Sequence, residues 1–120
     1  LKDGMRVWFA EMPDSVRTEI DAYGLTLSEE ELPTPGLNAA HIFVTDRAEM
    51  ERQLAILRDM IDPAGQVWVS WPKKTAKVDT DITEDIIREV ALPIGFVDIK
   101  VCAVDTVWSG LKLVIRRELR

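Results

Sequence analysis

The chain has 120 residues, of which 47% are hydrophobic and 30% charged, and a formal net charge of −6. This length fits one domain that buries roughly two-thirds of its unfolded surface, so we expect a single domain over residues 1–120. No apolar run approaches the ~20 residues of a membrane span and no secretory leader is recognised, so we expect a cytoplasmic protein without a membrane partner. A lone cysteine, Cys102, excludes an internal disulfide and a multi-cysteine metal site, and we expect no metal and no cofactor.

The negative charge is concentrated in one half of the chain. Residues 1–65 contain 6 Lys/Arg against 13 Asp/Glu, a balance of −7, and residues 66–120 contain 9 against 8, a balance of +1. Nucleic-acid binding needs a basic surface, so we expect no nucleic-acid partner. The basic clusters Lys73-Lys74-Lys77 and Arg116-Arg117-Arg120 still allow a local site for a small anion.

The first third of the chain predicts a strand, a helix and a brief second strand. Met5 to Ala10 is a short apolar run, typical of a strand buried on both faces. Asp14 is suited to cap a helix that ends at Gly24. Residues 25–27 predict the second strand, and the acidic, proline-containing residues 28–36 predict a mobile loop.

The middle of the chain predicts two further strand and helix units. Ala39 to Val44 reads as a buried strand, and Asp46 caps a helix with one apolar stripe formed by Met50, Leu54, Leu57 and Ile61. Residues 62–65 end that helix. Residues 67–71 form the next strand, and a second capped helix starts at Asp81. Alternation of strands with helices predicts a mostly parallel sheet with helical crossovers.

The last 25 residues have a different pattern. Apolar and polar residues alternate over Val97 to Ala103 and again over Leu111 to Arg116, and Asp105 to Gly110 joins the two segments. Period-two alternation in neighbouring segments predicts an antiparallel strand pair. We therefore predict a three-layer α/β fold with a single sheet. The sheet is mostly parallel and has an antiparallel strand pair at its C-terminal end.

This succession of motifs resembles the C-terminal half of a class I, S-adenosylmethionine-dependent methyltransferase. The resemblance is carried by Ala39–Asp46, Asp62–Lys73 and Gly95–Asp98, and residues 1–10 are similar to that family's first-strand entry. It implies a reduced Rossmann-like, methyltransferase-like fold over nearly the whole chain. In detail, residues 67–74, 80–85 and 101–112 resemble a family of short bacterial proteins of unknown function, which implies no activity.

The chain departs from the methyltransferase pattern at the cofactor loop. A cofactor-binding strand of this kind runs into glycines that let the backbone approach the ligand, but here it runs into Glu11-Met12-Pro13-Asp14, and proline removes an amide. Glu29 could replace the ribose-binding acid, although its acidic neighbours favour a solvated charge run. We predict that S-adenosylmethionine is not a ligand. Missing strand and helix units leave the first-strand side under-covered, which predicts a homodimer.

Ligands of open α/β sheets bind outside the carboxyl ends of the strands. The candidate ligand-binding residues there are Trp71, Lys73, Lys74, Asp105 and Trp108. We expect the two indoles to wall one cleft whose lysines attract a phosphate or carboxylate. The structural alternatives are solvated loop lysines and indoles that cover the end of the core.

No catalytic group is supported by a partner in the sequence. We expect His41 at the start of its strand, away from Ser109, which argues against a Ser-His arrangement, and Cys102 fits an inert thiol. Two functions remain open. One is a non-catalytic module that binds a small anion or a protein partner, and the other is a small-molecule transferase that uses Lys73 or Lys74 with Asp105. The missing acid–base pair favours the first.

Overall fold

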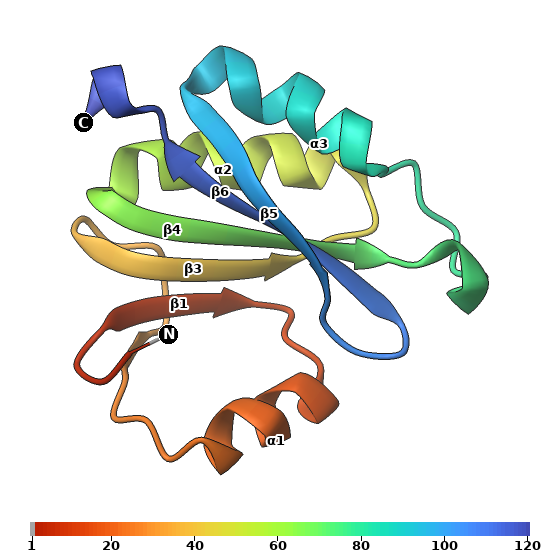
Figure 1. Cartoon of the computed structure of the whole chain (residues 1–120), viewed down its shortest axis with the longest axis horizontal. Helices are drawn as coiled ribbons and strands as arrows, with labels where there is room; N and C mark the ends of the chain where they lie inside the picture. Colours follow the sequence, from red (N-terminus) through yellow and green to blue (C-terminus); the bar gives the residue numbers. More distant parts are fainter. Residues whose placement is uncertain (1) are drawn as a thin grey trace.

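A computed structural model describes residues 2–120 and contains a six-stranded sheet with the strand order β2-β1-β3-β4-β6-β5 (Figure 1). The strands are β1 (Arg6–Ala10), β2 (Ser28–Glu30), β3 (Leu37–Phe43), β4 (Ile61–Pro72), β5 (Phe96–Ala103) and β6 (Trp108–Ile115). The helices are α1 (Asp14–Ala22), α2 (Arg47–Met60) and α3 (Glu84–Ala91), with short 3-10 turns η1 (Lys74–Ala76), η2 (Leu92–Ile94) and η3 (Arg117–Leu119). The first four strands are parallel, and β6 is antiparallel to β4 and β5. The predicted fold class is confirmed.

The helices are divided unequally between the two faces of the sheet. In Figure 1, α2 and α3 lie side by side, whereas α1 lies alone next to β1. Alternate strand residues follow this division, because Ile42 and Val69 belong to the core under α2 and α3 while His41 and Trp68 line a cavity beside α1. We call these the α2/α3 face and the α1 face.

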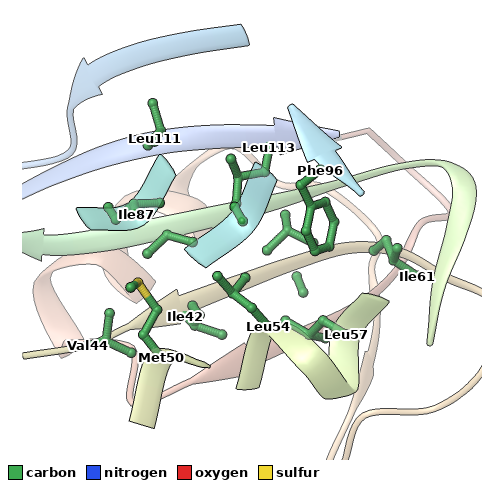
Figure 2. Packing of buried hydrophobic residues seen from close by; sticks show 14 of the residues in the cluster. Ile42, Val44, Met50, Leu54, Leu57, Ile61, Ile87, Phe96, Leu111 and Leu113 are labelled. Carbon is green, nitrogen blue, oxygen red and sulfur yellow. The ribbon is translucent and has the colours of Figure 1, made fainter. Parts of the chain in front are cut away.

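The main core lies on the α2/α3 face. Figure 2 shows Met50, Leu54 and Leu57 pointing from α2 into the sheet, and all three side chains are 0% exposed. They pack with strand residues such as Ile42 and Leu113. The predicted apolar stripe on this helix is confirmed as far as Leu57.

β4 begins earlier than the sequence pattern predicts. Ile61 already pairs with Leu37, and Gln66 is the next residue to pair, with Ala39, so residues 62–65 form a bulge inside the strand. The Asp62 side chain accepts a hydrogen bond from the amide of Ala64 at 2.9 Å, which closes this local turn. The proline and glycine of the segment therefore mark a bulge and not the gap between a helix and a strand.

Two predicted helix caps and the acidic loop need correction. Asp46 caps α2 as expected, but α1 has Pro13 at its N-cap without a side-chain hydrogen bond, and Thr83 caps α3 in place of Asp81. Residues 28–30, predicted as the start of a loop, form β2. Ion pairs from Arg17 to Glu29 and from Arg6 to Glu30, at 2.6 and 3.2 Å, hold these acidic residues at the sheet edge. In β2, ion pairs take the place of the apolar side chains from which most strands are predicted.

Within residues 2–120, no helix combines the length and the apolar character that crossing a bilayer requires.

Candidate functional site

A cavity of about 590 Å³ lies where β4 ends and α3 begins. It is lined by Trp71, Pro72, Lys73, Lys74, Val78, Thr80, Ile82, Thr83, Glu84 and Asp85. We call it the β4-end cavity. Its position at the carboxyl end of a parallel strand is where ligands bind in open α/β sheets.

The loop that borders this cavity is fixed at both ends. The amide of Lys73 donates to the carbonyl of Val107 at 2.7 Å, which attaches the loop to the β5–β6 hairpin. The hydroxyl of Thr80 donates to the carbonyl of Thr45 at 2.7 Å, just beyond β3, and accepts from the amide of Ile82 at 3.1 Å. The lysines of the loop are thus held at the edge of the sheet by backbone contacts that do not involve their side chains.

The charged side chains that line the cavity are two lysines and two acids. Glu84 and Asp85 pair with Arg88 at 2.6 and 3.1 Å, and Arg88 also pairs with Asp98 at 2.9 Å, so its single positive charge offsets only part of their negative charge. No ion pair within residues 2–120 involves Lys73 or Lys74. The amino end of α3 adds partial positive charge. Lys73 and Lys74 are therefore the cations that a phosphate or carboxylate would contact in this cavity.

The structure does not bring the two candidate indoles together. Trp71 packs against the core of the α2/α3 face. Trp108 pairs with Pro72, one residue further along β4, so its side chain leaves the sheet on the opposite face and meets Phe43 edge-on at 5.2 Å between ring centroids. The two indoles therefore do not wall one cleft, contrary to the expectation from the sequence. Trp71, Lys73 and Lys74 share the β4-end cavity, whereas Asp105 and Trp108 are absent from its walls.

Asp105 stabilises the turn of the β5–β6 hairpin. One of its carboxylate oxygens accepts from the amides of Val107 and Trp108, both at 2.8 Å, and the other accepts from the hydroxyl of Ser15 at 3.1 Å. Partial burial raises the pKa of Asp105, but these hydrogen bonds and the nearby charge of Lys73 outweigh it and hold the pKa below its ordinary value. A carboxylate that accepts this many hydrogen bonds is a weak proton acceptor.

A smaller cavity of about 250 Å³ lies on the α1 face, between α1 and the strands. His41 lines it, stacks on Phe43 with ring centroids 4.2 Å apart, and shares a 2.6 Å hydrogen bond between Nε2 and the Oγ of Ser70. Burial lowers the pKa of His41 to about 4, so the ring is neutral at pH 7.

The contact of His41 with a serine corrects the sequence expectation. β3 starts at Leu37, so His41 is its fifth residue and not its first. The Ser70 side chain is 0% exposed, and no carboxylate within residues 2–120 hydrogen-bonds to the other nitrogen of the ring. A nucleophile needs access and an oriented base, so this pair is structural. The register of β3 against β4, which creates it, has no local signal in the sequence.

Comparison with known proteins places the fold. No protein-family model matches the sequence, and no curated protein matches it. A magnesium protoporphyrin IX methyltransferase from Synechocystis PCC 6803, solved with bound SAM, is similar in structure, with a TM-score of 0.63, 12% identity, and coverage of 96% of this chain and 71% of that one. The chain has a methyltransferase-like fold.

Two further structures support this assignment. A SAM-dependent methyltransferase from Aquifex aeolicus has a TM-score of 0.61 at 15% identity, covering 97% of this chain and 85% of its own. A fibrillarin pre-rRNA processing protein from Methanococcus jannaschii has a TM-score of 0.59 at 9% identity, covering 95% of this chain and 67% of its own. At such identities the likeness concerns the fold alone.

The residues where this fold would hold S-adenosylmethionine do not fit it. The turn after β1 has Glu11 in the left-handed region, with a φ of 58°, where glycine is suited, and Pro13 lacks an amide. Glu29 is hydrogen-bonded by Arg17 at 2.6 and 2.9 Å, and this hydrogen bond lowers the pKa of Glu29. Both oxygens of Glu29 are thus already engaged by Arg17. Residues 2–120 also contain no cluster of three or more His, Cys, Asp or Glu side chains placed to hold a metal ion.

Proposed function

We propose that the protein binds a small anionic molecule in the β4-end cavity. The observation that carries this proposal is the pair Lys73 and Lys74, which line the cavity without ion-pair partners while its two acids, Glu84 and Asp85, are engaged by Arg88. A charge-assisted hydrogen bond contributes about 1.5–3 kcal/mol to binding when it is well formed. We therefore expect each lysine to contribute measurably to the affinity for an anion.

Group transfer is the second candidate function, and the comparisons favour it over a module without catalysis. Solved proteins of this fold carry the name methyltransferase. In this candidate, Lys73 and Lys74 hold the anionic part of a small substrate. Asp105 would be the proton acceptor, but its oxygens are occupied by Ser15 and by two backbone amides. The group donor would be a molecule other than S-adenosylmethionine, because the turn after β1 does not fit that cofactor.

Calorimetric titration with inorganic pyrophosphate tests the binding proposal. We expect saturable binding by the native protein and a loss of about tenfold or more for each of Lys73→Ala and Lys74→Ala. Both variants should keep their stability within ~0.5 kcal/mol, because their side chains are at the surface. Lys77→Asn is the matched control. It removes a neighbouring charge that does not line the cavity, and asparagine tolerates the left-handed backbone there, with a φ of 53°.

The result that contradicts the proposal is the absence of saturable binding, or an equal loss in Lys77→Asn. Titration with S-adenosylmethionine tests separately whether the protein is a methyltransferase. We expect no saturable heat, and binding at micromolar concentration would replace anion binding by methyl transfer as the function.

We also propose that the protein is a homodimer. α1 alone covers one face of the sheet, and the edge strand β5 exposes Ile99 and Val101 at 54% and 48%. Exposed edges and apolar surfaces favour association. Light scattering at micromolar concentration should give twice the chain mass of 13.6 kDa, and a monomer mass removes the idea.

A further inference from the structure

The β4-end cavity is larger than a simple anion requires. Its volume of about 590 Å³ falls within the roughly 300–1,000 Å³ of pockets that enclose whole small molecules. Besides the two lysines, its walls include the apolar side chains of Trp71, Val78 and Ile82. A phosphate or carboxylate at the lysines would leave this apolar surface uncovered.

Trp71 is placed to contact a ligand with its indole ring. The ring is half-buried, so it packs against the core and also borders the cavity. The indole N–H of Trp68 donates to Gln66 at 3.1 Å, but no hydrogen bond within residues 2–120 uses the indole N–H of Trp71. The same nitrogen is not one of the buried side-chain atoms that lack a hydrogen-bond partner, so it is accessible to solvent. Trp71 thus gives the cavity wall an indole side chain whose N–H is unused within the protein.

The acidic residues of the cavity add acceptors. Glu84 and Asp85 each give one oxygen to Arg88, and a carboxylate has further lone pairs that can accept from a hydroxyl or amino group. The walls of the cavity therefore combine positive charge, an aromatic side chain and hydrogen-bond acceptors.

We propose that the ligand is a flat ring that carries a phosphate or carboxylate, with the size of a mononucleotide. The ring lies against Trp71 and the anionic group reaches Lys73 and Lys74. This inference rests on the proposed function, because it assigns the substrate class of the same cavity. It adds a requirement that anion binding alone does not make, namely that a ring increases affinity.

AMP and ribose 5-phosphate are the matched probes, because both contain the sugar and the phosphate but only AMP contains a flat aromatic base. Stacking of one base on an aromatic side chain typically changes affinity by about tenfold or more. We expect calorimetry on the full chain to show AMP binding at least tenfold more tightly than ribose 5-phosphate. Trp71→Leu should remove this difference and leave the affinity for ribose 5-phosphate within about twofold.

Trp108→Leu is the matched control, since Trp108 lies on the neighbouring strand and on the opposite face. It should keep the preference for AMP. If Trp71→Leu does not fold, as judged by circular dichroism, the native protein still decides through the two probes. Equal affinity for AMP and ribose 5-phosphate overturns the ring-binding inference and leaves anion binding intact. Absence of binding by pyrophosphate, ribose 5-phosphate and AMP overturns both.

Discussion

The two faces of the sheet are built from the same strands but closed in different ways. On the α2/α3 face, the helix side chains Met50, Leu54 and Leu57 and the strand side chains Leu111 and Leu113 are all 0% exposed. On the α1 face, a helix of 9 residues buries only Val16, and the strands present half-buried aromatic side chains to a cavity. One face is a packed core and the other is partly open.

The type of strand side chain on each face corresponds to the helix cover of that face. Where two helices lie on the strands, branched aliphatic residues interdigitate with them and exclude water. Where one short helix lies, the strands carry Phe9, His41 and Trp68, whose wide rings cover more surface per residue. The tip of the β5–β6 hairpin adds Val104 to this cover. The open face is thus closed by side chains and a hairpin in place of a second helix.

The largest expected effect separates the two helices. Leu54→Ala on α2 should lower the free energy of unfolding by about 3 kcal/mol, because it leaves a cavity in close-packed surroundings. Ile20→Ala on α1 should cost less than about 1.5 kcal/mol, since Ile20 is only partly buried. Urea denaturation followed by circular dichroism measures both. Equal losses would show that the α1 face is as tightly packed as the core.

The second prediction uses the only histidine, which lies on the α1 face. Burial lowers the pKa of His41 from 6.5 to about 4, so below pH 6.5 the unfolded chain binds a proton that the folded chain does not. Stability from this group is therefore complete above pH 6.5 and declines as the pH falls toward 4, by up to about 3 kcal/mol.

The variant His41→Asn, which keeps a polar partner for Ser70, should show a shallower loss of stability over this range. Urea midpoints at pH 4, 5, 6, 7 and 8 give the comparison. Parallel curves for the native protein and the variant would mean that the histidine ring is solvated in the folded state.

The sequence predicts elements with a local pattern better than the pairing between strands, for a physical reason. Stripes at helical spacing, such as that of α2, and alternation over β5 and β6 are local patterns, and the structure contains both. The bulge at residues 62–65 and the strand at residues 28–30 depend on which strand pairs with which, and on the ion pairs of Arg6 and Arg17. These partners lie more than ten residues away, so no local pattern records them.

The same limit applies to the candidate site. Trp71, Lys73 and Lys74 lie at the end of one strand, so the sequence alone predicts that they are close together. In the structure, all three line the same cavity. Placing Trp108 beside them required the register of β6 against β4, and a shift of one residue changes the face to which a side chain points. Thr83, Glu84 and Asp85 line the cavity because the loop before α3 brings them to the end of β4. A cap signal at Thr83 was available, but nothing local linked it to the end of β4.

The smallest expected effect concerns the hairpin that helps to close the α1 face. A methyl group at Gly110 would meet Val104 at 2.8 Å and the ring of Trp68 at 3.3 Å. Gly110→Ala should therefore push the hairpin tip outward and cost about 1–2 kcal/mol, the lower range for added atoms in a packed site. Ser109→Ala is the control, because Ser109 points to the opposite face and should change stability by less than ~0.5 kcal/mol. Thermal unfolding gives both values, and tryptophan fluorescence should shift to the red only in Gly110→Ala, as Trp68 becomes more exposed. An unchanged emission spectrum and melting temperature would show that the hairpin tip moves without loss of stability. The α1 face would then be open even in the native protein.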